Sequence, residues 1–145
     1  MVRQLREYHL LDGRVLNDLG HARISNRERK DAWGIPPVVL HRIAGPAVTY
    51  PSGYQAYWIH GIRHRIDGPA IIYSDSDLKP LFYLFGKRME KEVFQDAVEK
   101  LNINLLTEYL IDPDDLLRKV AEETIKLLRA KENGTNINGA VDKKS

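Results

Sequence analysis

The sequence predicts an α+β fold, with an antiparallel β-meander of hairpin repeats followed by a C-terminal helical segment of two or three helices. The first observation behind this prediction is a duplicated stretch. Residues 40–50 read LHRIAGPAVTY and residues 63–73 read RHRIDGPAIIY, so that His41 and Gly45 recur 23 positions later as His64 and Gly68. A fixed period of this size is typical of repeat architectures. The second observation is a change to helical periodicity after residue 88.

Each copy of the duplicated stretch predicts one β-hairpin. A Gly-Pro turn precedes a run of strand-forming residues at 47–50 and again at 70–73. The chain then turns and returns through the aromatic-rich segments 54–59 and 81–85. Consecutive hairpins of this kind form an antiparallel meander. Because residues 81–85 are apolar at every position, both faces of this last strand need cover, which the following helices can supply.

Four parts are predicted along the chain. They are an irregular N-terminal β segment at 1–37, the two-copy hairpin module at 38–88, C-terminal helices at 89–131 that pack on the sheet or on a partner, and a disordered tail at 132–145. Within the first part, Asp12-Gly13 predicts a tight hairpin because both residues tolerate positive φ. The sequence leaves open whether the first 37 residues contain a degenerate copy of the repeat, for example at Trp33-Gly34-Ile35.

Three helical patterns are expected after residue 88. The first has an apolar stripe with two further apolar residues beside it: Met89, Val93, Ala97 and Leu101, with Phe94 and Val98. A second, short helix is expected at 105–110. The third is expected to begin with Asp112 as its N-cap and Pro113 as its first residue. The apolar face predicted for it consists of Leu117, Val120, Ala121, Thr124 and Leu128.

Composition limits the classes of function. The chain of 145 residues fits one domain, or one domain with a small appendage, and none of its apolar runs approaches the roughly 20 residues that a membrane-spanning helix needs. We expect no secretory signal, because no apolar segment follows the first charged residues. The absence of cysteine excludes disulfides, thiol nucleophiles and cysteine-based zinc sites. The net charge of +2 predicts no particular partner, and no cofactor is expected.

The polar and turn residues that recur with the repeat are expected to be structural. These are His41, Gly45, Pro46, His64, Asp67, Gly68 and Pro69. We expect each imidazole to bond a turn carbonyl in its own copy, and Asp67 to cap its own turn. A metal site at the two histidines is the alternative, but zinc needs three or four converging ligands, so none is assigned. No nucleophile elbow or phosphate-binding glycine loop is present, and no catalytic residue is assigned.

Arginine and aromatic residues of the predicted sheet are the candidate binding residues. They are Arg42, Tyr57, Trp58, Arg63, Arg65 and Tyr83. Side chains of these types anchor protein interfaces. They also stack on the bases of single-stranded nucleic acid. Ordinary cross-strand packing is a third interpretation of the aromatic residues.

The pattern His-Arg-x-x-Gly-Pro-Ala, then a strand, a turn and an aromatic strand, resembles a short tandem repeat of uncharacterised bacteriophage proteins. These repeats are similar in style to MORN (membrane occupation and recognition nexus) repeats, each of which is a β-hairpin. The segment FGKRMEKEVF at 85–94 is similar to the end of such arrays, and the resemblance covers about residues 38–94. Ala44 departs from the pattern, since the second copy has Asp67 there. The resemblance implies a phage or phage-derived origin, a structural or binding role, and a location in the host cytoplasm or in the virion.

The leading hypothesis is therefore a non-enzymatic protein-binding module, a phage or phage-derived accessory protein whose partner is a host or phage protein. The alternatives are a single-stranded nucleic-acid-binding protein, a virion structural component, and a small hydrolase or metal enzyme. No membrane partner is expected. The last helix also offers a face through which two copies of the chain can associate.

Overall fold

The computed structural model describes residues 5–19, 24, 37–111 and 114–132. The chain divides into two compact units, Met1–Glu99 and Lys100–Ser145. The strands of the first unit are β1 (Glu7–His9), β2 (Val15–Leu16), β3 (Val48–Thr49), β4 (Gln55–Ala56), β5 (Trp58–Ile59), β6 (Ile62–Arg63), β7 (Ile71–Ile72), β8 (Phe82–Leu84) and β9 (Lys87–Met89). They are followed by α1 (Lys91–Lys100), and the second unit holds α2 (Ile103–Thr107), η1 (Glu108–Ile111) and α3 (Asp115–Glu132). The predicted α+β class, an antiparallel sheet followed by C-terminal helices, is confirmed.

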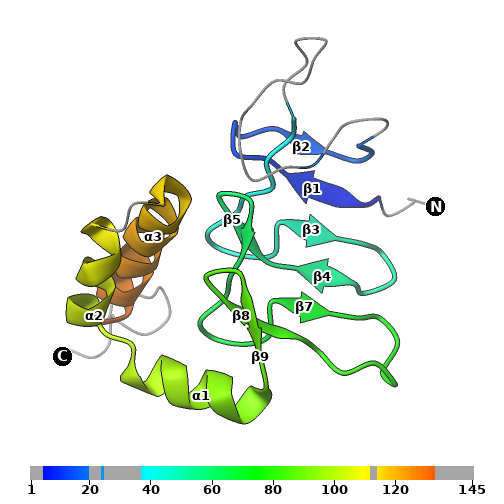
Figure 1. Ribbon diagram of the computed structural model, residues 1–145. Coiled ribbons are helices and arrows are strands. Elements are labelled where there is room, and N and C mark those ends of the chain that lie inside the picture. The colour runs from blue at the N-terminus through cyan, green and yellow to red at the C-terminus, as the bar shows by residue number, and fades with distance from the viewer. Residues whose placement is uncertain (1–4, 20–23, 25–36, 112–113, 133–145) are drawn as a thin grey trace, which may run out of the picture. The chain divides into compact units, whose positions relative to one another are not determined.

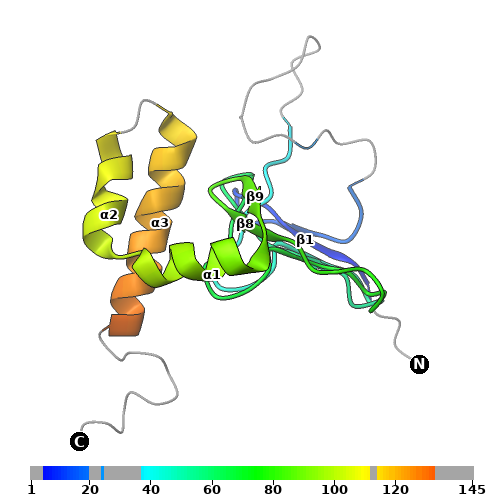
Figure 2. The same cartoon turned by 60° about the horizontal axis from the view of Figure 1, so that its bottom comes forward.

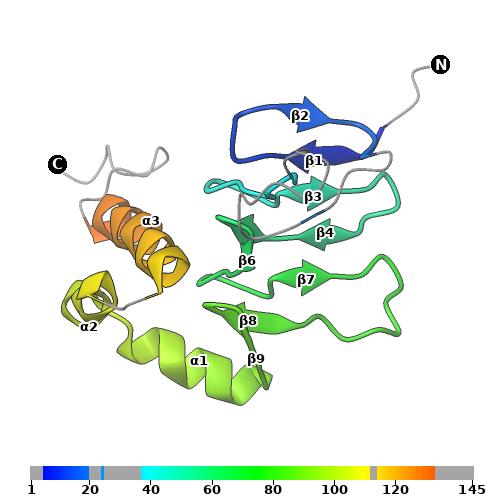
Figure 3. The same cartoon turned by 45° about the horizontal axis from the view of Figure 1, so that its top comes forward.

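A five-stranded antiparallel sheet in the order β2-β1-β3-β4-β7 forms the centre of the first unit (Figures 1 and 3). Strands β3 and β7, which come from the two copies of the duplicated stretch, lie on either side of β4. One row of paired residues crosses four strands and is buried throughout: Tyr8, Val48, Ala56 and Ile71. This row is the middle of the hydrophobic core, because alternate residues of each strand point to the same face.

The N-terminal hairpin predicted around Asp12-Gly13 is present. Strand β1 pairs with β2, and the backbone N–H of Leu10 donates to the carbonyl of Arg14 at 2.9 Å across the turn. Gly13 has a φ of +93°, a value that glycine reaches at little cost. Strand β1 also pairs with β3, so this hairpin extends the main sheet.

Each copy of the duplicated stretch contains a second, tight hairpin in addition to the predicted one. After Ala56 the backbone leaves the main sheet, and β5 pairs with β6 around His60-Gly61. In the second copy β8 pairs with β9 around Phe85-Gly86. The φ values are 50° and 76° in the first loop and 51° and 83° in the second. Positive φ at both central residues is the mark of the type I′ turn, whose twist suits a two-residue hairpin. The prediction of one hairpin per copy was therefore incomplete.

Matched hydrogen bonds relate the N-terminal strand to the duplicated stretch. The backbone N–H of His9 donates to Ala47 at 2.8 Å, and that of Tyr57 donates to Ala70 at 2.7 Å. In the same way, the antiparallel pair formed by Leu10 and Leu40 corresponds to the pair formed by Trp58 and Arg63. Segments 7–10 and 39–40 thus make the contacts of a further, interrupted copy. The candidate at Trp33-Gly34-Ile35 lies outside the described residues.

Helix α1 follows directly from the end of β9 (Figure 2). Its Phe94 is 4% exposed, and the ring lies 4.8 Å from that of Phe82 in β8. The expected cover for the all-apolar segment 81–85 is therefore provided in part by this helix. The predicted stripe was wrong in two places: Met89 belongs to β9, and Val93 is 57% exposed. The buried side is set by Phe94, because its ring reaches Phe82.

In the second unit, polar side chains cap two of the helices. The side chain of Asn102 accepts from the backbone N–H of Leu105 at 2.8 Å at the start of α2. The carboxylate of Asp114 accepts from the N–H of Leu116 at 2.9 Å at the start of α3. The helix therefore begins at Asp115 and its cap is Asp114, not the predicted Asp112, because the Asp114 carboxylate reaches the free N–H groups of the first turn. Residues 112 and 113 lie outside the described residues.

The buried face of α3 is rotated slightly from the predicted one. Its buried residues are Leu116, Val120, Ala121, Thr124 and Ile125, whereas Leu117 and Leu128 are only partly buried. Thr124 tolerates burial because its hydroxyl donates to the carbonyl of Val120 at 2.7 Å. The helix includes Glu132, the first residue of the predicted tail, and the rest of that tail lies outside the described residues.

Candidate binding site

Arg63 of β6 lies between the rings of Trp58 in β5 and Tyr83 in β8. We call these three side chains the Arg63 cluster. The guanidinium carbon is 4.9 Å from the centroid of Trp58 and 5.3 Å from that of Tyr83. Nη1 also donates a hydrogen bond to the Tyr83 hydroxyl at 3.2 Å. Trp58 and Arg63 face each other across one tight hairpin and Tyr83 belongs to the next, so the folding of successive hairpins assembles the cluster.

The charge of Arg63 is not neutralised by a carboxylate of the described residues, none of which forms an ion pair with it. Its Nε is buried and has no hydrogen-bond partner within that part of the chain. A guanidinium carries five N–H donors in a rigid fork. Within the described residues, the cluster therefore holds a partly buried cation that donates to Tyr83 through Nη1 and whose Nε has no acceptor.

A series of tyrosines continues the aromatic surface beside the cluster. The ring of Tyr54 lies 5.1 Å from that of Tyr50 and 6.0 Å from that of Tyr73. Tyr50 in turn meets Tyr8, and the two hydroxyl oxygens are 3.1 Å apart. Burial raises the pKa of Tyr54 above its ordinary value, and the nearby charge of Arg63 opposes that rise. Tyr8 belongs to the core, and Tyr50, Tyr54 and Tyr73 are partly buried and pack against it, so they form a firm border to the cluster.

Arg65 lies over the ring of Tyr57, 4.0 Å from its centroid, and makes the structural contacts of the second copy. Its Nε donates to the Asp67 carboxylate at 2.7 Å, and its Nη1 donates to the carbonyl of Pro69 at 3.0 Å. A Cβ on Gly68 would lie 2.9 Å from the guanidinium carbon, so glycine lets the arginine lie flat on the turn. Asp67 thus neutralises Arg65 and does not cap its turn as predicted, because its carboxylate faces the guanidinium two residues earlier.

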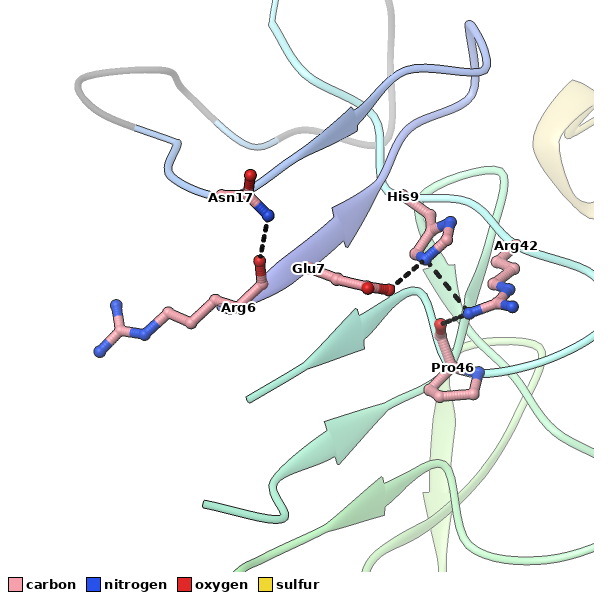
Figure 4. A network of polar contacts seen from close by, with 6 residues as sticks. All are labelled: Arg6, Glu7, His9, Asn17, Arg42 and Pro46. Carbon is pink, nitrogen blue, oxygen red and sulfur yellow. Dashed lines mark hydrogen bonds and ion pairs between the residues drawn. The ribbon is translucent and has the colours of Figure 1, made fainter. Parts of the chain in front are cut away.

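Arg42 makes the corresponding contacts in the first copy (Figure 4). Its Nη1 donates to the carbonyl of Pro46 at 3.3 Å, and a Cβ on Gly45 would lie 3.2 Å from its guanidinium carbon. Nε2 of His9 lies 3.1 Å from Nη1 of Arg42 and 3.2 Å from Oε1 of Glu7. An Nε2 without a hydrogen accepts from the arginine, whereas an Nε2 that carries one donates to the glutamate. The tautomer of the His9 ring therefore decides which of the two contacts is a hydrogen bond.

The two recurrent histidines hold the tight hairpins. Nδ1 of His41 accepts from the backbone N–H of His60 at 2.8 Å, and Nδ1 of His64 accepts from that of Phe85 at 3.0 Å. Each imidazole also lies 4.5 Å, centroid to centroid, from the ring of the residue whose N–H it binds. The predicted partner was a turn carbonyl, whereas Nδ1 of each ring accepts from a loop amide, because the positive-φ loop directs its N–H toward the ring. Burial lowers the pKa of His64 to about 4.

The six candidate binding residues therefore form separate groups. Trp58, Arg63 and Tyr83 come together with unused hydrogen-bonding capacity. In contrast, Arg65 with Tyr57, and separately Arg42, are engaged in contacts of the repeat itself. Tyr54 was not among the predicted site residues, although its position directly before β4 and two residues before Ala56 could have placed it on the same face as that buried residue.

Among the described residues, no three His, Asp or Glu side chains gather as metal ligands. No helix in that part of the chain is both long and apolar enough to cross a membrane. A shallow pocket of about 480 Å³ lies beside Tyr50 and Arg6, but it opens widely to solvent.

Comparisons of the chain with protein-family models, curated proteins and solved structures give no match. The geometry of the Arg63 cluster and its surroundings is therefore the basis for the functional proposal.

Proposed function

We propose that this chain is a non-enzymatic binding module that contacts a protein partner through the Arg63 cluster. The observation that supports this most is a partly buried arginine held between two aromatic rings without a carboxylate from the described residues. Arginine, tryptophan and tyrosine are the residue types that contribute most to the affinity of protein interfaces. Because the two hairpins fix the rings, little side-chain freedom is lost on binding.

The sequence resemblance to phage hairpin repeats extends this proposal to the setting of the protein. In it, the chain is a phage or phage-derived accessory protein and its partner is a host or phage protein. It acts in the cytoplasm of the host cell or as part of the virion.

Site-specific photocrosslinking tests the proposed contact. The photoreactive residue p-benzoylphenylalanine replaces Tyr54, which borders the cluster, or Tyr57, which lies under Arg65 and serves as the matched control. In bacterial cells that express the chain, we expect a protein adduct from position 54 that weakens when Arg63→Gln is added. Equal adducts from both positions, or none from position 54, would contradict the proposal.

Binding of single-stranded nucleic acid is the second candidate function. The guanidinium between two rings and the neighbouring tyrosines favour it, since bases stack on such side chains. Fluorescence anisotropy with a labelled 20-nucleotide oligothymidine tests it. Binding that weakens steeply with salt and is lost in Arg63→Gln would support this function. No binding at low salt would exclude it.

A further inference from the structure

We infer that the Arg63 cluster binds a carboxylate of an acidic protein segment, whose neighbouring apolar side chain packs against the tyrosines beside the cluster. This inference rests on the proposed function and names the chemistry of the partner. It predicts that the partner sequence contains aspartate or glutamate next to a large apolar residue.

The position of Arg63 in the repeated contacts is the first argument. Leu40 occupies the corresponding position in the interrupted copy formed by residues 7–10 and 39–40, where it pairs with Leu10 and is 2% exposed. The fold therefore accepts an apolar residue at this position. A cation at this position, with a buried Nε that has no partner among the described residues, lowers the stability of the fold because the charge and the N–H are removed from water. A group that pairs with the cation would offset this cost.

The contrast with Arg65 is the second argument. Both arginines lie over aromatic rings, at 4.0 Å for Arg65 and 4.9 Å for Arg63. Arg65 is neutralised by Asp67 two residues away, and the corresponding residue two positions after Arg63 is Arg65 itself. A carboxylate supplied from outside would give Arg63 the partner that Arg65 already has. Such a charge-assisted bond is stronger beside aromatic rings, where water is partly excluded.

The number of charges favours a single carboxylate over a chain of phosphates. Residues 37–90 contain six Lys and Arg against four Asp and Glu, and Arg65 is already paired within this region. A nucleic-acid backbone presents a phosphate at every nucleotide and is usually followed by several basic side chains. The Arg63 cluster itself contains a single cation, and the aromatic rings beside it carry no charge, so the cluster fits one acid beside an apolar residue.

Selection from a random 12-residue peptide library on the immobilised full chain tests the inference. Selected peptides are then measured by isothermal titration against the wild-type chain and four variants: Arg63→Gln, Arg63→Lys, Trp58→Phe and Arg88→Gln. Arg88 is the matched control, because it is an exposed arginine that pairs with Tyr83 across β8 and β9. Circular dichroism confirms that each variant is folded, and Arg63→Lys keeps the charge while losing the planar fork.

The expected result is a set of peptides enriched in Asp or Glu beside an apolar residue. Their affinity should fall roughly tenfold or more in Arg63→Gln, fall less in Arg63→Lys, and stay within about twofold in Arg88→Gln. Peptides without acidic enrichment whose binding needs Trp58 but not Arg63 would overturn the inference and leave the proposed function standing. If no selected peptide depends on Trp58 or Arg63 for its binding, both the inference and the proposed function are overturned. Displacement of the acidic peptides by 20-nucleotide oligothymidine would overturn the inference in favour of phosphate.

Discussion

Acidification should destabilise the first unit through the buried imidazole of His64. This side chain is 2% exposed, and burial lowers its pKa from 6.5 to about 4 in the folded chain. In the unfolded chain the imidazole gains its proton near pH 6.5, whereas the folded chain holds it neutral until about pH 4. The unfolded state thus binds more protons between these values, and stability falls as the pH falls through this window.

The magnitude follows from the two pKa values. The difference between 6.5 and about 4, at 1.36 kcal/mol for each pKa unit, amounts to roughly 3 kcal/mol of unfolding free energy. The loss should be complete near pH 4 and absent above pH 7. The pKa values of Asp12 and Asp115 are lowered below 3.8, first by hydrogen bonds from the Arg14 backbone and the Lys119 side chain, so these groups contribute their own losses as the pH falls through about 4 and below.

Urea unfolding followed by circular dichroism between pH 7.5 and pH 4 measures this effect. The control is His64→Asn, whose amide oxygen can accept from the Phe85 N–H without titrating. This variant should be less stable at pH 7.5 and should show a much smaller loss on acidification. The same pH dependence in both chains would refute the reasoning, since the buried imidazole would then not be its source.

Three further substitutions test other parts of the structure, each by urea or thermal unfolding. Gly68→Ala should cost about 1 kcal/mol and more than Gly45→Ala, because its Cβ would lie 2.9 Å from the Arg65 guanidinium and displace that arginine from Asp67 and Pro69, compared with 3.2 Å from Arg42 in the first copy; an equal loss would contradict this. Phe94→Ala should cost about 3 kcal/mol as the aromatic contact of α1 with β8 is lost, and a loss below about 1 kcal/mol would show that the helix is dispensable. Asp114→Ala should cost about 1 kcal/mol through the lost N-cap of α3. If the melting temperature followed by helical circular dichroism is unchanged, Asp114 is not the residue that caps this helix.

The meander could be predicted from the sequence because its signals are local. The Gly-Pro turns and the strand-forming runs at 47–50 and 70–73 are each complete within a few residues, and they recur at a fixed step. The further copy at 7–10 and 39–40 could not be found in this way. Its two halves lie far apart in the chain, and backbone hydrogen bonds alone relate them to the others.

The site was predicted in its residue types but not in its grouping. Arg63 and Arg65 are both arginines near aromatic residues, yet the first has no carboxylate partner among the described residues and the second is paired with Asp67. That pair could have been suggested from the sequence, because Asp67 lies only two residues from Arg65 within the same short turn segment. The meeting of Arg63 with Tyr83 could not, since it depends on the two-residue loops that stack one tight hairpin on the next.

The central claim is that Arg63 is present for binding, at a position where the fold accepts an apolar residue. The unfolding free energy of Arg63→Leu, measured beside the wild-type chain, tests it most directly. The variant loses two cation–aromatic contacts of about 0.5 to 1 kcal/mol each and a hydrogen bond of about 1 kcal/mol. It gains roughly 1.5 kcal/mol or more from burying leucine, and about 1 to 3 kcal/mol from removing a buried N–H that has no partner among the described residues. We therefore expect unchanged or higher stability, and a loss of more than about 1 kcal/mol would mean that Arg63 is a structural residue of the fold.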